Sequence, residues 1–126
     1  MKYTIKPTSK FQKDLKRVQK RGYDIKLLKE IIEKLSNGES LPPKNRDHNL
    51  SGNYSNCREC HITPDWLLIY EVYEEELYLY LTRTGTHSDL FWKAAVTNGR
   101  KNVSGSNSEI AIQRNKSREW ENIWKG

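Results

Sequence analysis

The spacing of apolar residues predicts a strand and a helix at the start of the chain. Tyr3 and Ile5 alternate with polar residues, which is typical of a short strand over residues 2–6, and Pro7 closes it. A helix then follows, with Thr8 or Ser9 as its N-cap and Gly22 as its left-handed C-terminal residue. Its apolar positions recur at intervals of four and three residues: Phe11, Leu15 and Val18.

A second helix begins after Asp24, a residue suited to an N-cap, and ends at Asn37 and Gly38. Its apolar stripe consists of Leu28, Ile31, Ile32 and Leu35. The turn between the two helices is short, so the sequence predicts a helical hairpin.

Three strands are expected after a polar loop over residues 39–56, in which Pro42 and Pro43 are adjacent. Alternation and aromatic content place these strands over residues 57–62, 66–73 and 77–82. The order strand, two helices, three strands predicts an α+β fold, in which the helical hairpin packs on a small antiparallel sheet.

The character of the sequence changes after Phe91, where glycine, asparagine and serine become frequent. We therefore expect a folded domain over residues 1–91 and a C-terminal extension over residues 92–126. The extension is expected to combine a linker with a short helix over residues 110–124.

Charge is distributed unevenly along a chain whose formal net charge is +6. Residues 1–46 hold 13 basic and 5 acidic side chains, residues 47–91 hold 2 and 8, and residues 92–126 hold 7 and 3. A basic first third suits a partner made of phosphates, although a solvated lysine-rich helix face has the same composition. No apolar run is long enough to span a membrane and the N-terminus lacks a secretory signal, so we expect a cytoplasmic protein.

Cys57 and Cys60 form a single CxxC in a predicted strand. Residues three apart on a strand point to opposite faces, and no second pair of ligands completes a zinc ribbon. We therefore expect two reduced thiols without special chemistry.

The three histidines of the chain all lie in polar surroundings near strand or loop ends: His48, His61 and His87. Imidazoles titrate near neutrality, so one can act as a base and another as an acid at the same pH. RNA cleavage by the 2′-hydroxyl needs such a pair, a cation for the phosphorane and a ring to stack on a base; Arg83 and Phe91 are the candidates for the last two tasks. A zinc site made of the histidines and Asp65 is the rival interpretation, but no short paired spacing supports it.

Three sequence blocks resemble the YafQ branch of the RelE toxin superfamily, over about the first 91 residues. They start at Lys44 (KNRDHNLSGNY), His61 (HITPDWLLIY) and Arg83 (RTGTHSDLF). The resemblance implies a toxin of a type II toxin–antitoxin system: a ribosome-dependent endoribonuclease that cuts messenger RNA in the A site without a cofactor or metal. Its implied partners are a cognate antitoxin, the 70S ribosome with its RNA, and the messenger RNA.

The functional residues that the resemblance implies are His48, His61, Asp65, His87 and Phe91. By analogy His87 is the general acid, while the base is His48, with Asp65 or His61 as competitors. Phe91 would stack on the RNA base, and the role of Arg83 is inferred from its charge. The basic face of the first helix would hold ribosomal RNA through Lys13, Lys16, Arg17 and Lys20.

Two features depart from the family pattern: the CxxC before His61, and the 35 residues that follow Phe91. Two other functions stay open at this point. A non-catalytic RNA- or protein-binding module, such as an inactivated toxin, has no need for the four polar site residues together. A metal-dependent hydrolase would lose its activity in a chelator.

Overall fold

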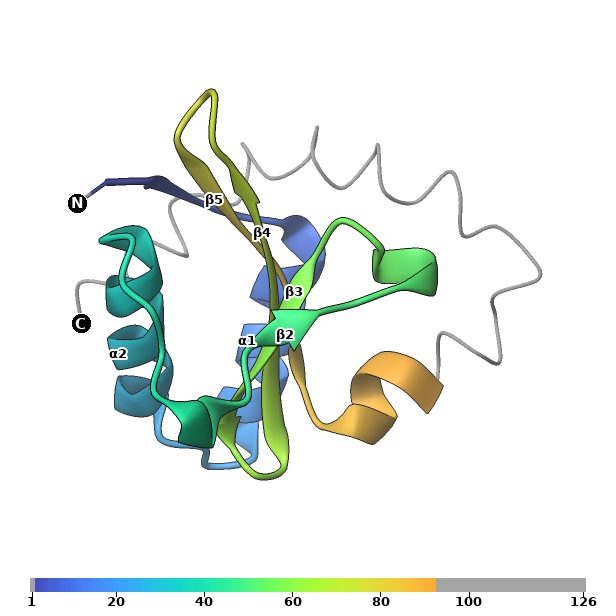
Figure 1. Ribbon diagram of the computed structural model, residues 1–126. Helices are drawn as coiled ribbons and strands as arrows, with labels where there is room; N and C mark the ends of the chain where they lie inside the picture. The colour runs from blue at the N-terminus through green and yellow to red at the C-terminus, as the bar shows by residue number, and fades with distance from the viewer. Residues whose placement is uncertain (1, 93–126) are drawn as a thin grey trace.

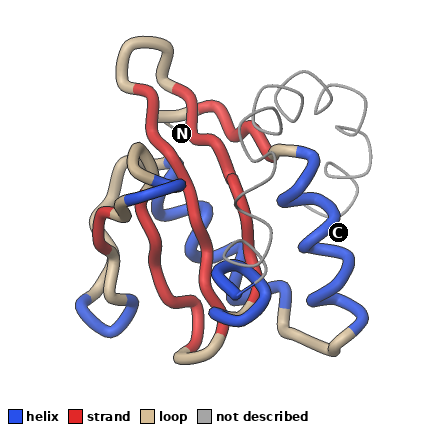
Figure 2. The backbone as a smooth tube through the Cα atoms, turned by 90° about the vertical axis from the view of Figure 1, so that its right-hand side faces the viewer, coloured by secondary structure: helices blue, strands red, loops and turns tan. Residues whose placement is uncertain are grey.

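A five-stranded sheet forms the centre of the molecule in the computed structural model, which describes residues 2–92 (Figure 1). Figure 2 shows the longer strands lying side by side between the helical elements. The elements in chain order are β1 (Thr4–Pro7), α1 (Ser9–Lys20), α2 (Ile25–Ser36), the 3₁₀ turn η1 (Pro43–Asn45), β2 (His48–Asn49), the 3₁₀ turn η2 (Gly52–Tyr54), β3 (Arg58–Thr63), β4 (Trp66–Tyr73), β5 (Tyr78–Gly85) and the π-helical turn η3 (Ser88–Trp92).

Both predicted helices are present with the predicted caps. The Thr8 hydroxyl accepts a hydrogen bond from Phe11 N at 3.0 Å, and the Asp24 carboxylate accepts one from Lys26 N at 3.1 Å. Helix α1 ends in a Schellman-type turn, in which Gly22 has φ of +85° and Tyr23 N donates to Val18 O at 3.1 Å. The local signals for these helix ends are therefore confirmed.

The strand order is β1-β5-β4-β3-β2, and all neighbouring pairs are antiparallel except β1 with β5, which are parallel. The α+β class with its helical hairpin is confirmed, but the sheet is mixed rather than wholly antiparallel. The helical hairpin lies between β1 and the other strands along the chain, so no tight turn forces β1 into an antiparallel pair. Residues 48–49, expected in a loop, form the edge strand β2 against β3.

The two faces of the sheet carry separate apolar clusters. Helices α1 and α2 bury the larger cluster, which includes Phe11, Leu15, Ile32, Leu68 and Leu79. On the opposite face, a smaller cluster is formed by Cys57, Leu67, Ile69 and Leu90, with Leu50, Tyr54 and Phe91 packed against it. Turns η2 and η3 therefore lie on the face that the helical hairpin leaves open (Figure 1).

No helix within residues 2–92 has the length and apolar character needed to cross a bilayer. The predicted linker and helix of the C-terminal extension lie outside the described residues, apart from Trp92 in η3.

Candidate active site

The sheet register brings the three histidines to the same end of the sheet. His61 on β3 pairs with Leu67 on β4, and Leu67 pairs in turn with Gly85 on β5, two residues before His87. Neighbouring strands are about 4.8 Å apart, so the backbone at His61 lies roughly 10 Å from that at Gly85. His48 pairs with Glu59, two residues before His61.

The turn that joins β3 to β4 contains the exposed Asp65 at this same end. The four predicted polar side chains His48, His61, Asp65 and His87 are therefore brought to one end of the sheet. Asn45 and Asp47 fix the segment that carries His48: Asn45 Nδ2 donates to His61 O at 2.7 Å, and Tyr70 Oη donates to Asp47 Oδ1 at 2.6 Å.

A buried carboxylate that the sequence analysis did not identify lies between two of the histidines. Glu59 Oε1 is 3.2 Å from His48 Nε2 and 4.0 Å from His61 Nε2. The Glu59 side chain is only 6% exposed, and its Oε2 atom has no hydrogen-bond partner within residues 2–92. The alternation of β3 places Cys57, Glu59 and His61 on one face, which is the sequence signal that could have revealed Glu59.

The second nitrogen of each imidazole also faces an acceptor. His48 Nδ1 is 2.7 Å from Arg46 O, and His61 Nδ1 is 3.3 Å from Pro64 O. A carbonyl oxygen can only accept, so a contact of this kind needs a proton on Nδ1. With a proton on Nδ1, the nitrogen of His48 that can accept a further proton is Nε2, which faces Glu59 Oε1.

His87 immediately precedes η3 and is exposed, and its ring lies against Phe91 with 4.6 Å between the ring centroids. Phe91 also meets Tyr54 of η2 edge-on, with centroids 5.9 Å apart. Leu90, which is fully buried, anchors the turn in the smaller apolar cluster. The structure thus presents an imidazole beside a partly buried aromatic pair.

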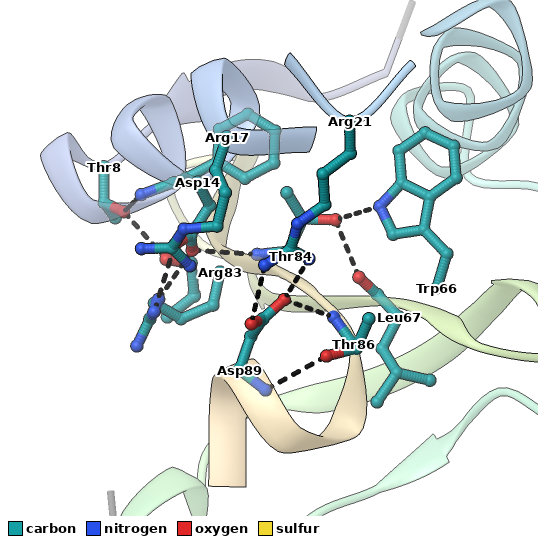
Figure 3. A network of polar contacts seen from close by, with 12 residues as sticks. Thr8, Asp14, Arg17, Arg21, Trp66, Leu67, Arg83, Thr84, Thr86 and Asp89 are labelled. Carbon is teal, nitrogen blue, oxygen red and sulfur yellow. Dashed lines mark hydrogen bonds and ion pairs between the residues drawn. The ribbon is translucent and has the colours of Figure 1, made fainter. Parts of the chain in front are cut away.

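Arg83 is tied to helix α1, an interaction that the sequence analysis did not foresee. Its Nε and Nη2 atoms donate to Asp14 at 2.6 and 3.0 Å, and Thr84 N donates to the same carboxylate at 3.1 Å (Figure 3). Burial disfavours the charged guanidinium, but the hydrogen bonds and charge of Asp14 outweigh burial and raise the pKa of Arg83 above its ordinary value. The Tyr54 side chain also interacts with the guanidinium, which is only 15% exposed, so Asp14 and Tyr54 together fix its position.

The basic face of helix α1 contains exposed lysines and one arginine that pairs with a buried carboxylate. Lys13, Lys16 and Lys20 are exposed, as a surface that contacts RNA would require. Arg17 instead pairs with the buried Asp14 carboxylate at 3.4 Å, so it also belongs to the internal polar network.

Groups of three or more His, Cys, Asp and Glu side chains that could hold a metal ion do not occur among residues 2–92. Cys57 and Cys60 are free thiols buried in the two different apolar clusters, so they lie on opposite faces of the sheet, as predicted.

Residues 3–92 match a family that is described as bacterial toxin of type II toxin–antitoxin system, YafQ. The mRNA interferase toxin YafQ of Escherichia coli K12 is 39% identical over 88 residues, which cover 69% of this chain and 94% of that protein.

Solved structures agree with the sequence match. A metal-bound toxin from Helicobacter pylori is 45% identical with a TM-score of 0.67, and the match covers 71% of this chain and 99% of that one. The E. coli DinJ–YafQ toxin–antitoxin complex contains a chain that is 37% identical with a TM-score of 0.65, covering 72% of this chain and 99% of that one.

Proposed function

The chain belongs to the YafQ family of bacterial type II toxins, and on this premise we propose that it is an mRNA interferase that cleaves by metal-free general acid–base catalysis. The observation that carries the proposal is the convergence of His48, His61 and His87 at one end of the open sheet face. Imidazoles suit this chemistry because they donate and accept protons near neutral pH.

The reaction uses the nucleophile that RNA itself contains. A base removes the proton of the 2′-hydroxyl, the oxygen attacks the adjacent phosphorus, and an acid protonates the departing 5′-oxygen. The products are a 2′,3′-cyclic phosphate, or the 3′-phosphate formed by its opening, and a 5′-hydroxyl. Each proton transfer contributes about 10²–10⁴-fold to the rate, so loss of either group should be severe.

His87 is our candidate for the general acid, because it is exposed and lies against Phe91, on which a splayed base can stack. His48 remains the first candidate for the base, with His61 and Asp65 as the competitors. Glu59 contributes a negative charge that lies 3.2 Å from His48 Nε2 and 4.0 Å from His61 Nε2. Arg83 supplies positive charge for the phosphorane from the position that Asp14 gives it.

The partners follow from the family and from the charge of α1. Lys13, Lys16 and Lys20 would contact ribosomal RNA while the messenger lies in the A site of the 70S ribosome. A cognate antitoxin is expected because the E. coli relative is solved as a DinJ–YafQ complex. A ribosome-dependent enzyme of this kind acts in the cytoplasm.

Primer extension on messenger RNA after brief expression tests the function. We expect in-frame cuts within coding regions from the native chain and none from His87→Ala, because the leaving oxygen then lacks its acid. His87→Gln keeps a polar side chain of similar size and should be equally inactive while retaining the native circular dichroism spectrum. Full activity of either variant would remove His87 from the mechanism.

A transition-metal chelator at constant Mg²⁺ separates this mechanism from a metal-dependent one. Cleavage of programmed ribosomes should continue unchanged, because the proposed steps use only side chains. Loss of activity that Zn²⁺ or Cu²⁺ restores would favour a metal-dependent hydrolase. No cuts from the folded native chain would favour an inactivated toxin that only binds.

A further inference from the structure

A bidentate ion pair joins the C-terminal end of helix α1 to the turn that carries His87 (Figure 3). Arg21 Nη1 donates to Asp89 Oδ2 at 2.7 Å, and Arg21 Nη2 donates to Asp89 Oδ1 at 3.1 Å. Each nitrogen donates to a different oxygen, so the pair fixes a direction as well as a distance. The partners are 68 residues apart, which means that the contact joins two elements that no local interaction connects.

Asp89 also organises the turn from within. Its Oδ2 atom accepts a hydrogen bond from Thr86 N at 3.0 Å, while Asp89 N donates to Thr86 Oγ1 at 3.1 Å. This reciprocal arrangement is a capping box, and His87 is the first residue inside it. Hydrogen bonds from Arg21, followed by those from Thr86, hold the pKa of Asp89 well below its usual value, so the carboxylate stays ionised at neutral pH.

Gly85 provides the room that this arrangement needs. Its φ of +153° is a conformation that side chains rarely adopt, and a Cβ atom there would lie 2.9 Å from Asp89 Oδ2. The Asp89 carboxylate can fold back over the end of β5 only because residue 85 has no side chain. Helix α1, the end of β5 and the His87 turn are thereby held together at a single carboxylate.

Arg21 contributes little to the stability of the fold, but it orients the turn that carries His87. Its side chain is 38% exposed, and an ion pair with an exposed partner adds little to the free energy of unfolding. The hydrogen bonds of the capping box already pair the backbone N–H groups of Thr86 and Asp89 without Arg21. What Arg21 adds is a fixed orientation of the turn relative to α1, the helix whose lysines face the RNA in the proposed function.

We propose that Arg21 and Asp89 form a positioning pair that fixes the His87 imidazole for protonation of the leaving oxygen. The proposal rests on the ribonuclease function proposed above. Neither residue touches the substrate; Arg21 acts through Asp89, and Asp89 acts through the backbone of the turn. A small displacement of a catalytic group reduces the rate strongly even when the fold is intact.

The first test measures single-turnover cleavage of programmed ribosomes at saturating toxin. Arg21→Ala and Asp89→Asn should each lower the rate constant by about 10-fold, because either one abolishes the ion pair. Asp89→Asn keeps an amide oxygen for Thr86 N, so it removes the pair but retains the cap. The double variant should be no slower than the slower single variant, since both remove the same interaction. Arg21→Lys, which keeps one charged contact, should recover part of the rate.

The matched control is Asp24→Ala. Asp24 caps helix α2 and accepts a hydrogen bond from Lys26 N, so its loss weakens a helix end but keeps the hydrogen bonds of Asp89 to Arg21 and Thr86. We expect an unchanged rate constant for this variant. An equal loss of rate in Asp24→Ala would mean that reduced stability accounts for the effect, and the proposal would be wrong.

The two single variants also separate positioning from RNA contact. Arg21→Ala removes a positive charge, whereas Asp89→Asn removes a negative one and cannot weaken attraction to phosphate. A rate loss confined to Arg21→Ala would assign Arg21 to RNA binding and overturn the proposal.

The second test does not need activity: the imidazole resonances of His87 are followed by NMR in the free toxin. The Arg21→Ala and Asp89→Asn variants should shift the His87 signals and leave those of His48 and His61 in place. Unmoved His87 signals would overturn the positioning role whatever the enzyme does. Moved signals together with a fully active His87→Ala variant would instead overturn the proposed function and leave the structural coupling intact.

Discussion

At the scale of single residues, burial decides the chemistry of the two cysteines. Cys57 is 8% exposed and Cys60 is fully buried. Burial raises the pKa of the Cys57 thiol to about 11 and that of the Cys60 thiol still further. The thiolate is the reactive form, so both cysteines should be inert at neutral pH.

We therefore predict that iodoacetamide at pH 8 modifies neither cysteine in the folded protein at an appreciable rate. Labelling followed by mass spectrometry should be about 100-fold or more slower than in denaturing urea, where thiol pKa values return to about 8.5. Raising the pH should accelerate labelling of Cys57 before Cys60. A rapid native reaction of Cys60, or a disulfide between the pair, would contradict the buried positions.

Single residues also mark the limit of what the sequence could predict about the site. The sequence indicates His48, His61 and His87 as candidates, because their residue type and polar neighbours suit proton transfer. Glu59 was missed because its role depends on the pairing of β2 with β3, which places His48 opposite it. The partner of Arg83 was missed because Asp14 is 69 residues away in the chain.

At the scale of elements, helix α1 hydrogen-bonds to the part of β5 that extends beyond its pairing with β1. Pairing of β1 with β5 stops at Pro7 and Leu81, yet β5 continues to Gly85. Side chains of the N-cap and first turns of α1 take over: Thr8 Oγ1 donates to Thr82 O at 2.9 Å, and Asp14 accepts from Thr84 N. The helix therefore satisfies backbone groups that a longer strand would otherwise pair.

Asp14→Ala should be among the most destabilising single substitutions on α1. Its side chain is 2% exposed, and its loss would leave the largely buried Arg83 guanidinium without its counter-charge. Removing one partner of a buried ion pair costs about 3–5 kcal/mol, which urea unfolding can measure directly. Lys13→Ala, a neighbouring exposed position, is the control and should change the free energy of unfolding by less than about 0.5 kcal/mol. An equally small effect of Asp14→Ala would mean that Arg83 finds another partner.

The elements that the sequence predicted correctly are those fixed by local patterns. Helices α1 and α2 follow from apolar spacing and from the caps at Thr8 and Asp24, and β4 has the predicted bounds. The parallel pairing of β1, the short strand β2 and the three extra residues of β5 depend on contacts between distant segments. No periodicity within a segment specifies such contacts.

At the scale of the whole molecule, the basic face of α1 predicts a binding step that depends on salt. Reversing Lys13, Lys16 and Lys20 to glutamate should weaken binding to vacant ribosomes most at low ionic strength. If all three lysines contact phosphates, the slope of log K against log salt should fall by about 2–3. Arg17 is left unchanged because it pairs with Asp14, and a glutamate there would disturb the interior.

The matched control is a triple variant in which three exposed lysines outside α1 are changed to glutamate. Lys26, Lys34 and Lys44 are exposed outside α1, and their reversal changes the net charge by the same amount. Equal losses from both triple variants would indicate a general charge effect rather than a binding face on α1. An unchanged salt slope in the α1 variant would identify its lysines as a solvated surface only.

The predicted boundary between the folded domain and the C-terminal extension can be tested with a shortened chain. The family match ends at residue 92, and every described site residue lies before that point. A chain ending at Trp92 retains both apolar clusters and the Arg21–Asp89 pair. It should therefore unfold cooperatively in urea and cut messenger RNA at the same positions as the full chain.

Residues 93–126 hold seven basic and three acidic side chains, so their removal should weaken ribosome binding mainly at low salt. Faster cleavage by the shorter chain at saturating concentration would show instead that the extension restrains the site, and failure to fold would show that residues 1–91 are not a domain by themselves.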